Sequence, residues 1–316
     1  MPKYGTFVVS NDKDEIKGLV KVGYIPIECS IGGESIVDNL KLDHHGDLSS
    51  YPPVSVSGYD KWGIAKDKPG VVCAGNADAD ACFCAAAILG LIPHPSFTKE
   101  GAPPPVVASW KKNLNGLAET IGIIDTDPIG KKIRDLPGGP ELILWNTMSG
   151  NGGDSLGFAS GVGLWRTITT SRPEVIKPML DAASAAERDR EVLSNRELEE
   201  RGCIINDILV IRDSRIWGFN EWYGRLDNNN DPTDPKSWKH PVVVALVETT
   251  KNITIGCPNN EVAIKLFGSK GLMELFPKLK PEGWGGRESV GGSPRGMEMT
   301  WESVLACAKT ISQSIK

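Results

Sequence analysis

Residues 71–93, VVCAGNADADACFCAAAILGLIP, decide the fold of the N-terminal half of the chain. The apolar run Val71–Ala74 predicts a buried strand, and an acidic turn follows it. The Ala-rich stretch Ala79–Leu91 predicts a helix, because alanine favours helix and Pro93 stops it. A strand, a turn and a helix in this order predict a parallel sheet whose functional residues lie at the carboxyl ends of its strands.

Further strand-like runs lie on both sides of this stretch and alternate with helical or loop segments. This alternation predicts a mostly parallel sheet that is covered on both faces. The predicted strands of the first half are Thr6–Ser10, Ile36–Leu42, Val71–Ala74, Thr120–Ile124 and Glu141–Asn146.

The second half begins with a long charged helical stretch from Pro173 to Gly202, which predicts a connecting helix. The elements predicted after it are strands at Cys203–Arg212, Pro241–Thr249 and Asn252–Gly256 and helices at Asn260–Phe276 and Trp301–Ile315. We therefore expect an α/β fold with a mostly parallel sheet in an N-terminal domain, and a smaller α+β C-terminal domain. The expected boundaries are residues 1–170, 171–201 for the connecting helix, and 202–316.

Composition limits the partners of a chain of 316 residues and 34.1 kDa. Its net charge of -5 argues against a large binding surface for duplex nucleic acid. The longest nearly uncharged apolar stretch, Ala81–Pro93, is too short to span a bilayer. The seven cysteines form no CxxC pair, and the N-terminus is charged too early for a secretory signal. We expect a cytoplasmic protein without membrane partners, and a homo-oligomer is compatible with the sequence.

The stretch LDHHG, residues 42–46, holds two of the four histidines. Where a chain turns at a strand end, neighbouring residues such as His44 and His45 can both reach one site. Imidazole and carboxylate are suitable ligands for Mn, Zn and Fe. Three other acidic stretches each follow a strand-like run: GNADADA (75–81), IIDTDPIG (123–130) and GNGGDSLGF (150–158). The structural alternative for each aspartate is a helix N-cap or a turn residue.

Together these motifs resemble those of the DHH phosphoesterase superfamily, which includes exonucleases, oligoribonucleases, cyclic-dinucleotide phosphodiesterases and manganese pyrophosphatases. The run GGRESVGGSPRG, residues 285–296, is similar to the glycine-rich loop of the DHH-associated domain. The resemblance therefore reaches both halves of the chain. In this family two metals clamp the attacking and leaving oxygens of a phosphoryl transfer.

The resemblance implies roles for individual residues. Two Mn²⁺ ions, with Mg²⁺ as the alternative, would be held by His44, Asp78, Asp80, Asp125 and Asp154, and Asp125 would bridge them. His45 would face the phosphate and Asp43 would orient its neighbours, so that these two complete the catalytic set. The implied substrate-binding residues are Arg287, Arg295, Gly285, Gly286, Gly291 and Gly292.

The sequence departs from the family pattern in two ways. The DHH motif precedes the DxD motif here, whereas it follows it in the family. Ala74 also stands where most members carry a metal-binding histidine, so one metal lacks a ligand. A second DxD, Asp12 and Asp14, follows the first predicted strand and is the alternative to Asp78 and Asp80.

We expect a phosphoesterase that hydrolyses a small nucleotide-like phosphodiester or phosphomonoester with a water activated by two metals. Its partner would be a small phosphorylated substrate. The alternatives are a non-catalytic binding protein that keeps the DHH fold, which Ala74 favours, and a single-strand-specific exonuclease. An exonuclease calls for a basic groove, and the acidic net charge does not favour one.

Overall fold

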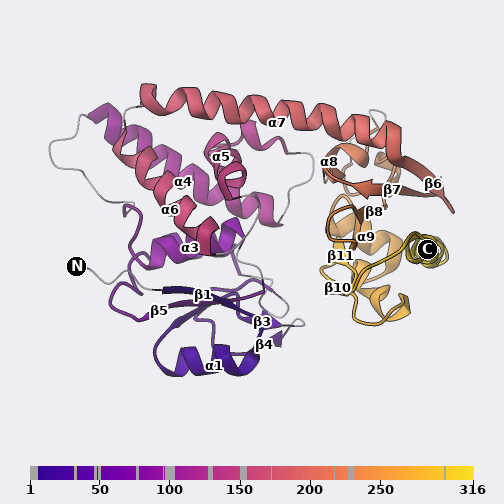
Figure 1. Cartoon of the computed structure of the whole chain (residues 1–316), viewed down its shortest axis with the longest axis horizontal. Coiled ribbons are helices and arrows are strands. Elements are labelled where there is room, and N and C mark those ends of the chain that lie inside the picture. Colours follow the sequence, from indigo (N-terminus) through magenta and orange to yellow (C-terminus); the bar gives the residue numbers. More distant parts are fainter. Residues whose placement is uncertain are drawn as a thin grey trace. The chain divides into compact units, whose positions relative to one another are not determined.

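The computed structural model divides into two compact units, Met1–Glu187 and Arg188–Lys316 (Figure 1). It describes residues 6–31, 34–45, 48, 51–75, 78–94, 96, 104–126, 131–149, 155–171, 173–216, 218–226, 231–294 and 297–316. Mixed α/β structure with a parallel sheet in the first unit and a separate mixed sheet in the second confirms the predicted fold class. No helix of the described residues combines the length and apolarity needed to cross a membrane.

A three-stranded parallel sheet organises the first unit, with β5 between β1 and β2. Its strands are β1 Thr6–Ser10, β5 Gly70–Ala74 and β2 Ile25–Ile27. The predictions at 6–10 and 71–74 are confirmed. Every residue of β5 is buried, as expected of a central parallel strand covered on both faces. A short antiparallel pair, β3 Ser30–Ile31 and β4 Glu34–Ser35, follows β2.

Helices cover both faces of this sheet (Figure 1). Helix α1, Lys13–Lys21, covers one face and buries Ile16 against Cys29, Val72 and Ala74. On the other face lies α3, Ala79–Ile88, and the larger apolar core surrounds it. The other helices of this unit are α2 Val54–Asp60, α4 Pro104–Thr126, η2 Ile133–Asp135, α5 Gly139–Ser149 and α6 Ser155–Thr170.

Small residues let α2 approach its neighbours closely. A Cβ on Gly58 of α2 would lie 2.5 Å from the Cys84 sulfur of α3, so only glycine permits this contact. In the same way, a Cβ on Gly122 of α4 would lie 2.8 Å from Cβ of Pro53, which is the N-cap of α2. The first contact holds α3 against α2, and the second holds α4 beside the N-terminus of α2.

Three predicted strands of the first half are wrong. Residues 36–42 contain no strand, because Leu40 and Lys41 adopt positive φ angles of 52° and 60° that break an extended chain. Residues 120–124 lie in α4 and residues 141–146 lie in α5. Short apolar runs do not distinguish a strand from a buried helix.

Helix α7, Pro173–Arg201, confirms the predicted long helix, and the second unit begins within it at Arg188. Its six-stranded sheet has the order β10-β11-β9-β8-β7-β6, and only β7 and β8 are parallel neighbours. Its strands are β6 Gly202–Ile205, β7 Ile208–Ser214, β8 Val243–Val247, β9 Ile253–Gly256, β10 Gly285–Gly286 and β11 Val290–Gly292. Its helices are α8 Phe219–Trp222, η3 Pro235–Ser237, α9 Asn260–Phe267, η4 Gly271–Glu274, η5 Phe276–Lys278 and α10 Trp301–Ser312.

Two predictions for this unit need correction. The single strand predicted at 203–212 is a hairpin, because Asn206 and Asp207 turn the chain with φ angles of 49° and 66°. The helix predicted at 260–276 ends at Phe267, after which Gly268 adopts a φ of 117° and 3₁₀ turns follow.

Candidate metal centre

The DHH motif lies beside the end of β2 and is not itself part of a strand. The backbone N–H of Glu28, the residue after β2, donates to the carbonyl of Leu42 at 2.8 Å. Asn39 accepts from the backbone N–H of Cys29 at 3.0 Å. These bonds attach the loop that carries Asp43, His44 and His45 to the carboxyl end of the parallel sheet, where α/β proteins place their sites.

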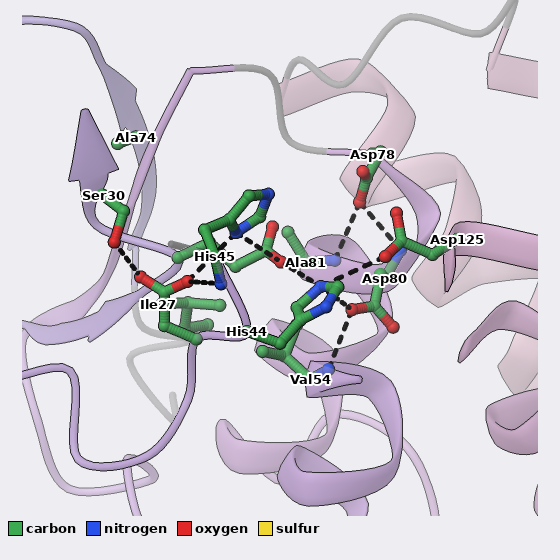
Figure 2. A network of polar contacts seen from close by, with 12 residues as sticks. Ile27, Ser30, His44, His45, Val54, Ala74, Asp78, Asp80, Ala81 and Asp125 are labelled. Carbon is green, nitrogen blue, oxygen red and sulfur yellow. Dashed lines mark hydrogen bonds and ion pairs between the residues drawn. The ribbon is translucent and has the colours of Figure 1, made fainter. Parts of the chain in front are cut away.

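His44 is buried and its ring nitrogen Nε2 faces three carboxylates. Nε2 lies 3.0 Å from Oε1 of Glu28, 3.1 Å from Oδ2 of Asp125 and 3.5 Å from Oδ2 of Asp80. Figure 2 shows the ring of His44 directed toward Asp80 and Asp125. None of these three contacts is aligned as a hydrogen bond to Nε2 among the described residues. Several ligand-type atoms thus converge on one buried nitrogen.

Asp80 is held in place by the N-terminus of α2. Its Oδ2 accepts from the backbone N–H of Val54 at 2.8 Å, and its Oδ1 accepts from that of Ser55 at 2.9 Å. Each carboxylate oxygen has two lone pairs, so Oδ2 can accept this bond and still face His44. Backbone donors that orient a carboxylate are typical of the shell behind a metal ligand.

Asp125 reaches the same place from the last turn of α4. The close contact of Gly122 with Pro53 brings this end of α4 to the start of α2, where Asp80 is bound. The prediction that Asp125 follows a strand is therefore wrong, although its carboxylate does lie beside His44. Asp125 therefore reaches the cluster from a helix and not from the end of a strand.

Crowding of the carboxylates changes the protonation of the cluster. Burial raises the pKa of the Glu28 carboxyl to about 8, and the neighbouring charges of Asp78 and Asp80 add to this. Burial opposes a charge on His44, yet the carboxylates of Asp125, Asp80 and Glu28 raise its pKa to about 12. The cluster therefore attracts positive charge.

His45 belongs to a different arrangement. Its Nδ1 lies 3.0 Å from Oδ1 of Asp43, and its backbone N–H donates to the same oxygen at 2.9 Å. Asp43 is fully buried and also accepts from Ser30 and Asn39. Burial opposes ionisation of Asp43, but the hydrogen bonds from His45 and Ser30 keep its pKa below the usual value. These bonds fix the His45 ring beside Asp43, and the orienting role that the resemblance implies for Asp43 stays a prediction.

The other predicted metal ligands are placed differently. Asp78 is the N-cap of α3, because its Oδ1 accepts from the backbone N–H groups of Asp80 and Ala81 at 3.0 and 3.1 Å. The alternative residue Asp12 caps α1 in the same way. Asp154 lies outside the described residues. The metal-ligand roles of Asp78 and Asp154 stay predictions.

The chemistry of the cluster fits a divalent cation. One group of possible ligands is Glu28, His44 and His45, and another is His44, Asp80 and Asp125; within each group the ligand atoms lie within 4.8 Å of one another. Carboxylates this close repel one another unless a cation balances them. Imidazole and carboxylate together are suitable ligands for Mn and Zn.

Glu28 is the residue of this cluster that the sequence analysis missed. It stands alone after the short strand IPI and belongs to no acidic motif. A signal was nevertheless present, since a carboxylate that directly follows an apolar run was the criterion applied to the other acidic stretches. The run itself was too short to be recognised as a strand.

The glycine-rich loop of the second unit forms the hairpin of β10 and β11, with Gly285 opposite Gly292 and Gly286 opposite Gly291. A Cβ on Gly291 would lie 2.5 Å from the Phe276 ring, and one on Gly286 would lie 2.2 Å from the Val290 carbonyl. Packing therefore accounts for these two glycines. Arg287 is half-buried beside the hairpin and Arg295 lies outside the described residues. Their contact with substrate stays a prediction.

No protein-family model matches the chain, and no curated protein matches it. Among solved structures the chain is similar to a pGpG-specific phosphodiesterase, PggH, from Vibrio cholerae, with a TM-score of 0.35 and 14% sequence identity. The similarity covers 56% of this chain and 58% of that protein, so less than two thirds of the neighbour is spanned. A likeness at this level carries no conclusion about function.

Proposed function

We propose that this protein is a metal-dependent phosphoesterase that hydrolyses a small nucleotide-like phosphodiester or phosphomonoester, with Mn²⁺ preferred over Mg²⁺. The observation that carries the proposal is the buried Nε2 of His44, which faces the carboxylates of Asp80 and Asp125 at 3.5 and 3.1 Å. The motif resemblance supports the same chemistry.

His44, Asp80 and Asp125 would hold a divalent cation, and Asp78 and Asp154 are further ligands implied by the resemblance. A cation bound here would supply Lewis-acid catalysis, which lowers the pKa of water and neutralises phosphate charge. The protein would contribute a fixed set of donors. The N-terminus of α2 orients Asp80 through two backbone hydrogen bonds, so this carboxylate needs no rearrangement on binding.

His45 would contact the phosphate and exchange a proton with it or with the leaving oxygen. Asp43 binds Nδ1, so the proton-exchanging atom is Nε2 on the opposite side of the ring. A carboxylate that fixes one imidazole nitrogen selects the tautomer and orientation of the other, as in general acid–base catalysis. About a third of the His45 side chain, 30%, is exposed to solvent, so a substrate can reach it.

The proposed substrate is small because the chain carries a net charge of -5. Long polyanions need many basic contacts along their backbone. Arg287 and Arg295 of the glycine-rich loop would supply a few, in the planar bidentate form that suits phosphate.

A hydrolysis screen with Mn²⁺ tests the proposal. The full chain is assayed on phosphomonoesters, linear dinucleotides and short and long single strands, with Mn²⁺, with Mg²⁺ and after treatment with a chelator. Turnover of monoesters or dinucleotides that requires Mn²⁺ supports the proposal. Salt-sensitive degradation of long strands without turnover of small substrates would instead identify an exonuclease.

Ala74 favours a second candidate, a binding protein without catalysis. It ends β5, which leads to the DxD motif, and its methyl group offers no ligand atom. Turnover of none of these substrates, with Mn²⁺ bound to the protein, would support this candidate.

A further inference from the structure

Glu28 occupies the strand end next to Ala74. In the parallel pairing of β2 with β5, the last residue of β2, Ile27, lies opposite Cys73, and β5 ends one residue later at Ala74. The residue after Ile27 is Glu28, and the residue after Cys73 is Ala74. Of these two neighbouring positions, only the one after β2 carries a side chain that can bind a metal.

The Glu28 side chain is directed into the cluster and removed from water. The residue is 6% exposed, and its Oε1 lies 3.0 Å from Nε2 of His44 and 3.7 Å from Nδ1 of His45. A buried carboxylate is unfavourable without a cationic or hydrogen-bonding partner. Asp80 and Asp125 face the same ring nitrogen, so three carboxylates converge on one imidazole nitrogen.

The backbone conformation at Glu28 directs its side chain toward His44. Its φ angle is 48°, in the left-handed region that residues with a Cβ avoid. The hydrogen bond from its N–H to the Leu42 carbonyl at 2.8 Å holds this conformation. Such conformations persist where the surrounding structure enforces them, and they cluster at functional sites.

The ring nitrogen of His44 gives independent evidence for a ligand. The side chain of His44 is 3% exposed, and Nε2 makes no aligned hydrogen bond within the part of the chain that the structure describes. A buried polar atom without such a bond is costly, and a bound ion is among its ordinary explanations. A cation bound at Nε2 would lie beside the carboxylates of Glu28, Asp80 and Asp125.

We propose that Glu28, beside His44, is a direct ligand of a cation bound in this cluster. This inference rests on the proposed function and extends it to the selectivity of the site. Glu28 adds a carboxylate oxygen beside the imidazole of His44, and carboxylate favours Mn²⁺ and Mg²⁺ whereas imidazole suits Zn²⁺ well. Glu28 therefore directs the site toward Mn²⁺.

The test is titration of the full chain with Mn²⁺ by calorimetry, comparing wild type with Glu28→Gln. Loss of an outer-shell partner already costs about 10–100-fold in metal affinity, so loss of this direct ligand should weaken Mn²⁺ binding by at least about 100-fold. The matched control is Glu141→Gln, a buried glutamate of α5 that is in neither group of possible ligands. It should bind Mn²⁺ as wild type does.

The outcomes separate this inference from the proposed function. Equal Mn²⁺ affinity in wild type and Glu28→Gln overturns the ligand role and leaves the phosphoesterase proposal intact. Absence of Mn²⁺ binding in wild type overturns both. Thermal unfolding tests whether Glu28 only supports His44 structurally. In that case Glu28→Gln would lower the melting temperature without metal, whereas a ligand role predicts an unchanged metal-free value and loss of the rise that Mn²⁺ induces.

Glu28→His keeps a donor at this position and tests selectivity. The variant should bind Zn²⁺ more tightly relative to Mn²⁺ than wild type does, because a nitrogen replaces an oxygen. An unchanged preference would contradict the direct contact of this side chain with the ion.

Discussion

His44 and His45 are neighbours in the chain, yet they lie in different environments. His44 is buried and its Nε2 faces three carboxylates, whereas the side chain of His45 is 30% exposed and is bonded to Asp43. The carboxylates around His44 come from the end of β2, from α3 and from α4. The partner of His45 comes from two positions earlier in the same loop.

This difference separates two kinds of chemistry within one short motif. A cluster assembled from distant elements concentrates negative charge and suits a cation. A pair made within one loop fixes a single ring and suits proton exchange. We therefore propose that the residues around His44 bind the metal and that His45 contacts the substrate.

The largest expected effect is that of His44→Ala. We expect Mn²⁺ affinity and hydrolysis both to fall by more than about 100-fold, since loss of an outer-shell partner alone costs about 10–100-fold in affinity or activity. Calorimetry and the hydrolysis assay measure the two effects. His240→Ala, in the second unit, is the control and should leave both unchanged. Retained Mn²⁺ affinity in His44→Ala would remove the distinction between the two histidines.

Asp125→Ala should abolish metal-dependent hydrolysis while the protein stays folded. Asp125 is at the end of α4 and its side chain is 15% exposed, so its loss leaves no large cavity. The assay is combined with circular dichroism. Glu119→Ala, an exposed carboxylate on the same helix, should behave as wild type. Full activity in Asp125→Ala would show that the cluster around His44 does not serve catalysis.

Asp43→Asn tests the other histidine. We expect kcat to fall by roughly 10–100-fold with Mn²⁺ affinity retained, because general acid–base groups contribute about 10²–10⁴-fold and His45 would lose only its orientation. Ser30→Ala removes one of the bonds to Asp43 and should have a smaller effect. A loss of Mn²⁺ binding in Asp43→Asn, with kcat unchanged at saturating metal, would reverse the roles assigned to the two regions.

The smallest effect is expected at Asp78. Asp78→Ala removes the N-cap of α3 and should lower the free energy of unfolding by about 1 kcal/mol, whereas Asp78→Asn keeps a capping oxygen and should be nearly neutral. Chemical denaturation measures both variants. Weaker Mn²⁺ binding by Asp78→Asn at unchanged stability would show that this aspartate is also a ligand.

Local features of the fold were predictable from the sequence. The strand at 71–74 and the helix that follows it are defined by a continuous apolar run, an alanine-rich stretch and a proline. The strand predictions at 120–124 and 141–146 failed because each run is a short part of a longer helix. In α4 the buried residues Leu114, Leu117, Ala118 and Ile121 have helical spacing, which a window of five residues does not reveal.

The site was predictable only in part. The DHH motif and the aspartates at 80 and 125 were identified from their motifs, and the structure brings them together. Glu28 was not, because the apolar run before it is too short to be recognised as a strand and the left-handed turn that directs it toward His44 is visible only in the structure. The capping contact of Asp78 was weighed as an alternative for aspartates at strand ends, and only the hydrogen bonds to α3 establish it.

Binding of Mn²⁺ to the wild-type protein is the most direct test of a metal site around His44. In a titration followed by electron paramagnetic resonance, the signal of free Mn²⁺ decreases as the ion binds to protein. We expect wild type to remove at least one ion per chain from solution and His44→Ala to remove far less at the same concentrations. A free Mn²⁺ signal that is the same with wild type, with His44→Ala and with buffer alone would contradict this expectation.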